Sequence, residues 1–109
     1  MAEISKLKTS SNTISMIIDI EYPTFKKFYD NEKHNIYIKI VDLFEKVIEE
    51  NIEKNLLVVA KIDGDVFDTT FDISKSNKKL FTEKISPYFE SIEEYEVCEK
   101  IKELLSRAI

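Results

Sequence analysis

The chain has 109 residues, of which 43% are hydrophobic and 34% are charged, and its net charge is −5. This balance is typical of one globular domain and excludes disordered, collagen-like and disulfide-scaffold proteins. The single glycine excludes the Gly-rich phosphate loops of nucleotide-binding proteins, and one cysteine with one histidine excludes an internal disulfide and a Cys/His zinc site. The sequence therefore predicts no cofactor.

The charge pattern argues against a protein that binds nucleic acids. Acidic residues outnumber basic ones by 21 to 16, and Arg107 is the one arginine among the basic residues. Binding to a phosphate backbone usually needs an excess of Lys and Arg, and the reading of base edges relies on the arginine fork. An acidic balance favours solubility and a basic protein partner.

No segment predicts insertion into a membrane or transport across one. The longest apolar run, Leu56–Ala60, is far shorter than the roughly 20 residues of a spanning helix. Residues 1–12 lack the apolar stretch of a signal peptide. We therefore expect a cytoplasmic protein with no membrane partner. Residues 1–12 predict a mobile leader, and residues 13–109 predict a single α+β domain.

Residues 13–22 predict the first strand. From Ile14 to Tyr22, apolar side chains occupy every second position, which is the period of a half-buried strand. Pro23 ends this pattern, because proline cannot donate a hydrogen bond to a strand ladder.

Two helical segments are predicted next. Residues 24–31 carry aromatic side chains at helical spacing and predict one or two turns before the polar Asp30 and Asn31. A longer amphipathic helix begins near Ile36 and ends near Asn55, with apolar residues on one side and glutamates on the other.

Residues 56–73 predict a β-hairpin. Asp63–Gly64 is a favoured dipeptide for a two-residue type I′ turn, because both central residues of that turn need a positive φ. The turn places Lys61 opposite Val66 and Ala60 opposite Phe67, and the same register continues along both strands. One face is then consistently apolar, as a correct register should give, and faces the core. Its members are Leu56, Val58, Ala60, Ile62, Phe67, Phe71 and Ile73.

The remaining residues predict two helices. Ser76 is placed to cap the first, and Pro87 is expected to break or kink it. Ser91 with Glu94 forms a capping-box pattern, so the second helix is expected to start at Ser91. Its predicted docking stripe consists of Ile92, Tyr95, Cys98, Ile101 and Leu105.

The order of these elements predicts an α+β two-layer sandwich. A small, mostly antiparallel sheet of about three strands, in β-α-β-β-α order, carries helices packed on one face. The direction of the first strand relative to the hairpin stays open at this point.

The other face of the sheet is the predicted partner interface. Apolar residues in its centre are rimmed by acids, which is the anatomy of a protein interface. The predicted interface residues are Ile17, Asp19, Glu21, Leu57, Val59, Val66, Asp68 and Asp72. The alternative is that this face is covered by the leader or by residues 22–30.

A basic segment supports a second hypothesis. Lys75, Lys78, Lys79 and Lys84, with Glu83 among them, give a charge of +3 and could contact phosphates. The alternative is that these lysines cover the outer face of a helix whose other side is in the core.

Two further residues carry groups that take part in catalysis in other proteins, an imidazole and a thiol. His34 has no neighbouring nucleophile in the sequence, and we expect it to be a solvated surface histidine. Cys98 lies on the predicted docking stripe, and we expect a packed and unreactive thiol.

Four aspartates near the hairpin turn, Asp63, Asp65, Asp68 and Asp72, depart from the order of a calcium loop, so no metal site is predicted. The function predicted is a small, acidic, non-enzymatic protein-binding module, acting as an accessory, adaptor or inhibitor protein. The expected partner is another protein, whose identity the sequence leaves open; a nucleic-acid-handling protein with a basic cleft, or a second copy of the chain, would fit. A nucleic-acid-binding domain and a small enzyme built on Asp/Glu pairs are the alternatives.

Overall fold

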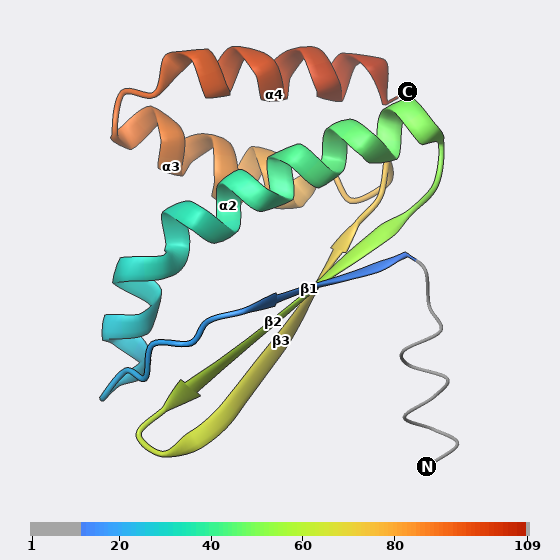
Figure 1. Cartoon of the computed structure of the whole chain (residues 1–109). Helices are drawn as coiled ribbons and strands as arrows, with labels where there is room; N and C mark the ends of the chain where they lie inside the picture. The colour runs from blue at the N-terminus through green and yellow to red at the C-terminus, as the bar shows by residue number, and fades with distance from the viewer. Residues whose placement is uncertain (1–11, 109) are drawn as a thin grey trace.

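A three-stranded mixed sheet forms the base of the molecule, as the computed structural model, which describes residues 12–108, shows (Figure 1). The strands are β1 (Thr13–Ile17), β2 (Lys54–Ile62) and β3 (Asp65–Ile73), in the spatial order β1-β2-β3. β1 runs parallel to β2 because a crossover helix joins them, and β3 runs antiparallel to β2. The predicted β-α-β-β-α order with helices on one face is confirmed.

The hairpin has the predicted turn and register. Asp63 and Gly64 both have positive φ, at 53° and 83°, as a type I′ turn requires. Lys61 lies opposite Val66, and the predicted pairs continue from there along the whole length of β2 and β3.

The first strand ends earlier than predicted. β1 stops at Ile17, and the chain regains the sheet through a single parallel bridge from Tyr22 to Ile62. The N–H of Ile18 donates to the carbonyl of Val59, but the next such bond, to Lys61, comes from Tyr22. Two extra residues are therefore looped out, and they leave Ile20 62% exposed although its position in the alternation predicts burial.

A single long helix, α2 (Phe25–Glu50), replaces the two helical segments predicted from the sequence. It begins at the N-cap Thr24, whose hydroxyl accepts a hydrogen bond from the N–H of Lys27 at 3.2 Å. The polar stretch around Asn31 does not interrupt it. The helix ends at Asn51, which adopts the left-handed conformation, so the end predicted near Asn55 is also wrong.

The helix after the hairpin changes its hydrogen-bond pattern instead of stopping at proline. η1 (Leu80–Ile85) is a π-helical turn and leads directly into α3 (Ser86–Ser91). Pro87 lies in the first turn of α3, where its missing N–H is tolerated. Ser76 does not cap this helix, because its hydroxyl pairs with that of Ser74 at 3.0 Å.

The last helix, α4 (Tyr95–Arg107), starts four residues later than predicted. Ser91 belongs to α3, where its hydroxyl donates to the carbonyl of Tyr88, and it forms no capping box. The predicted docking stripe is also rotated. Leu104 is buried and Leu105 is half-buried, whereas Tyr95 is exposed.

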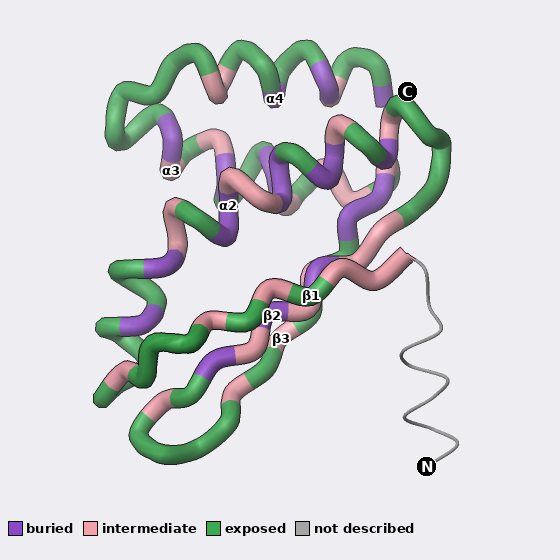
Figure 2. The backbone as a smooth tube through the Cα atoms, in the orientation of Figure 1, coloured by how far each residue is buried: buried purple, intermediate pink, exposed green. Residues whose placement is uncertain are grey.

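The core lies between the sheet and the helices (Figure 2). Leu56 and Val58 of the central strand are fully buried beneath α2. The rings of Phe44 and Phe81 stack with centroids 4.2 Å apart and join α2 to η1. α4 packs against α2 and α3 on the side away from the sheet (Figure 1). Within residues 12–108, no helix combines the length and the apolarity that crossing a bilayer requires.

Candidate functional site

The sheet face opposite the helices, called the open face below, carries an apolar centre. Leu57 and Val59 of β2 are half-buried there, and Ile17 and Val66 are 69% and 71% exposed. Val59 sits in the middle of the face, between Ile17 of β1 and Asp68 of β3. Since alternate residues of a strand point to opposite faces, these side chains point away from the core formed by Leu56 and its neighbours.

The predicted acidic rim divides into two groups in the structure. Asp68 and Asp72 are exposed on the open face, where Asp72 lies opposite Asn55. Glu21 instead supports the hairpin turn, because its carboxylate accepts a hydrogen bond from the N–H of Gly64 at 2.8 Å. Asp19 is exposed in the looped-out segment beyond β1.

The segment after β1 does not cover the open face. Phe25 and Phe28 both contact Phe67, at ring-centroid distances of 5.2 and 5.9 Å, and Phe67 is on the core-facing side of β3. The alternative that residues 22–30 cover the open face is therefore wrong, because their aromatic rings pack on the other side of the sheet. Of the predicted leader, residues 1–11 lie outside the described residues. Within residues 12–108, all helices lie on the opposite face of the sheet (Figure 1).

A second feature, which is not among the sequence predictions, is a cavity of about 220 Å³ on the core-facing side of β3, called the aromatic cavity below. It is formed by the N-terminal half of α2, by β3 and by η1. Its lining residues are Phe25, Phe28, Tyr29, Lys33, Ile36, Tyr37, Phe67, Thr69, Phe71 and Lys84. The one sequence signal for it was the spacing of rings at Phe25, Tyr29 and Tyr37, which places them along one side of a helix.

His34 is not the solvated histidine that was expected. It is half-buried between α2 and α3, and its Nδ1 lies 3.0 Å from the hydroxyl of Tyr88. Its ring also meets that of Phe89 edge-on, with centroids 5.7 Å apart. Burial, together with the charge of Glu94, raises the pKa of Tyr88, so this hydroxyl stays protonated at neutral pH.

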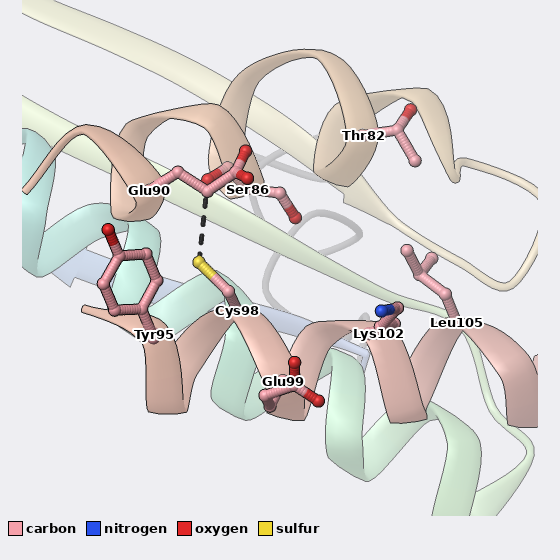
Figure 3. Close-up of a pocket in the computed structure, with 8 residues that line it drawn as sticks. All are labelled: Thr82, Ser86, Glu90, Tyr95, Cys98, Glu99, Lys102 and Leu105. Atoms are coloured by element: carbon pink, nitrogen blue, oxygen red, sulfur yellow. Dashed lines mark hydrogen bonds between the residues drawn. The ribbon is translucent and has the colours of Figure 1, made fainter. Parts of the chain in front are cut away.

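Cys98 lies in a groove of about 360 Å³ between α4 and the η1–α3 segment (Figure 3). Its thiol is half-buried and points to the carbonyl of Ser86, with a sulfur–oxygen distance of 3.9 Å. Burial and the nearby carboxylate of Glu90 raise the pKa of the thiol. A raised pKa lowers the thiolate fraction, which agrees with the expected unreactive thiol.

The four lysines of the basic segment do not line one common cavity. Lys75 donates to the side-chain oxygen of Asn51 at 2.6 Å, beside the end of α2. Lys84 lines the aromatic cavity. Lys78 is half-buried and Lys79 is exposed, just before η1. Phosphate binding by this segment stays a prediction.

The aspartates near the hairpin turn are also spread out. Asp63 forms part of the turn, Asp65 is exposed at the start of β3, and Asp68 and Asp72 are on the open face. In the part of the chain that the structure describes, no three acidic, histidine or cysteine side chains gather in a way that could hold a metal ion.

Comparisons with known proteins add no relative. No family model, no curated protein and no solved structure matches this chain.

Proposed function

We propose that the chain is a non-enzymatic protein-binding module whose open face binds a basic protein partner. The observation that carries the proposal is the sheet face itself. Val59 and Leu57 form an apolar centre that no helix covers within residues 12–108, and exposed acids stand beside it. Apolar centres with polar rims are how protein interfaces are built, with the centre supplying affinity and the charges supplying orientation.

Charge complementarity favours a basic partner over a second copy of this chain. The strand residues on the open face include two acids, Asp68 and Asp72, and one basic residue, Lys61. The whole chain carries a net charge of −5. Two copies would therefore bring acidic faces together, and like charges across an interface are unfavourable. A partner with lysines or arginines around an apolar centre has the opposite charge, which suits an adaptor or inhibitor that occupies a basic cleft.

The size of the face favours a reversible complex. β2 and β3 have nine residues each, so the sheet is about 30 Å long, and three strands span about 14 Å. The projected area is then about 400 Å², which is about half of what each partner buries in a standard interface. The proposed complex belongs among small, transient interfaces, in which a single charge at the centre has a large effect.

We also propose a cytoplasmic location, which cell fractionation would test.

The experiment uses three forms of the chain as baits in a lysate of the native host: wild type, Val59→Lys and Ile92→Lys. The proteins that each bait captures are compared by quantitative mass spectrometry. Val59→Lys places a charge at the centre of the open face. Ile92→Lys makes a similar aliphatic-to-lysine change at a position 43% exposed on the helical side, and it serves as the matched control. A partner that binds wild type and Ile92→Lys but not Val59→Lys supports the proposal.

Equal capture by a folded Val59→Lys variant, with folding checked by circular dichroism, would contradict the proposal. Self-association in analytical ultracentrifugation that Val59→Lys abolishes would replace the basic partner with a second copy. Binding of an oligonucleotide that weakens steeply with salt would instead favour residues 75–84.

A further inference from the structure

The walls of the aromatic cavity are built mainly from rings. Phe25 meets Phe67 edge-on at a centroid distance of 5.2 Å and stacks with Tyr29 at 6.1 Å, with only 10° between the planes. Phe71 completes the wall on the side of β3. Ring faces and edges in this arrangement offer a planar apolar group both stacking and edge-to-face contacts.

The size of the aromatic cavity suits one ring. An apolar cavity of about 150 Å³ already holds benzene, and drug-sized ligands occupy about 300–1,000 Å³. At about 220 Å³, this cavity has room for a single ring with a short substituent. A nucleotide or a long acyl chain is too large to enter it completely.

Two lysines are the charged residues among those that line the aromatic cavity. Lys33 and Lys84 line it, and none of the described residues that line it is acidic. The Nζ atom of Lys33 lies 4.7 Å from the ring centroid of Tyr29 and 5.1 Å from that of Tyr88, so cation–π contacts hold it between α2 and α3. In residues 12–108 no ion pair engages either lysine. Two lysines without a neighbouring acid in the lining are complementary to an anion, although the whole chain is acidic.

Hydroxyl groups add hydrogen-bond donors. The hydroxyls of Tyr29 and Tyr37 lie 3.1 Å apart, and one of them donates to the other. The second hydroxyl proton remains for another acceptor. Burial and the contact with Tyr29 raise the pKa of Tyr37, so its hydroxyl keeps its proton at neutral pH.

We propose that the aromatic cavity binds a single planar ring that carries a carboxylate. The ring packs among Phe25, Phe67 and Phe71, and the carboxylate pairs with Lys33 and Lys84. This site lies on the core-facing side of β3 and is independent of the open face, so either proposal can fail without the other.

Titration of the full chain with phenylacetate, followed by ¹H–¹⁵N NMR, tests the site. Phenylacetate is expected to shift amide signals in residues 25–37 and 67–71, with a dissociation constant on the order of 1 mM or below. 2-Phenylethanol has the same ring without the charge, and we expect it to bind at least about tenfold more weakly. Acetate has the charge without the ring, and we expect no saturable shift. Equal binding of 2-phenylethanol, or no saturable binding of phenylacetate, would overturn the proposal.

Matched variants test the role of the lysines. Lys33→Gln and Lys84→Gln should each weaken phenylacetate binding about tenfold, because each removes one charge-assisted contact. Lys46→Gln changes the net charge equally at an exposed position of α2 that does not line the cavity, and it should bind like wild type. If Lys33→Gln and Lys84→Gln both bind as tightly as Lys46→Gln, the cavity does not recognise a carboxylate.

Discussion

Replacing Gly64 with valine tests the turn that sets the register of both sheet faces. Gly64 has a φ of +83°, and a Cβ atom placed on it would meet no atom within 4 Å. The Cβ atom itself therefore meets no clash, and the expected cost is that of an L-residue in a left-handed conformation. This strain is about 1–2 kcal/mol, with a β-branched side chain at the upper end. For a domain of this size, it lowers the melting temperature by about 4–8 °C.

Gly64→Asn is the matched comparison, because asparagine tolerates the left-handed conformation and its Cβ atom would meet the same open space. We expect it to lose less than half as much stability as Gly64→Val. Thermal melts and urea denaturation would measure both variants. A Gly64→Val protein that melts like wild type, or an asparagine variant that loses as much as the valine variant, would refute the type I′ turn.

Three further predictions concern packing, pH and the interface. Leu104→Ala should cost about 3 kcal/mol and Leu105→Ala about 1 kcal/mol in urea denaturation, because Leu104 is 1% exposed and Leu105 is half-buried; the reverse order would contradict the observed rotation of α4. Burial raises the pKa of Tyr37 above its ordinary value of about 10, so above that pH the unfolded state binds fewer protons and stability falls. Tyr37→Phe should therefore lose less stability than wild type between about pH 8 and about pH 11, and equal losses would count against the buried hydroxyl. Asp68→Asn should weaken partner binding about two- to threefold at low salt, because a charge at the rim of an interface contributes little. The difference should disappear near about 0.5 M salt, where such charges are screened. A loss that does not depend on salt would mean that Asp68 makes a direct buried contact.

The parts of the fold that depend on local chemistry could be predicted from the sequence. Asp63–Gly64 determines its own backbone conformation, and the register of nine residue pairs follows from that turn alone. The assignment of Val58 to the core and of Val59 to the open face followed from this register, and both positions have the expected burial.

Other local signals were overridden by tertiary contacts. Glu32, in the polar stretch around Asn31, is itself buried, and its carboxylate accepts a hydrogen bond from the hydroxyl of Tyr22. The helix therefore continues through this stretch. Ser91 and Glu94 match a capping box, but α3 extends through Ser91, and Glu93 takes a positive φ of 61° to turn the chain. The aromatic cavity and the burial of His34 depend on residues from distant elements, which a single sequence does not place together.

The most direct test of the open face is methyl NMR of the full chain, labelled at isoleucine, leucine and valine, during titration with the captured partner. We expect the methyl signals of four open-face residues to shift or broaden as the partner is added: Ile17, Leu57, Val59 and Val66. The signal of Ile92, on the helical side, should stay unchanged. Changes at Ile92 with none at the four open-face residues would contradict the proposed interface.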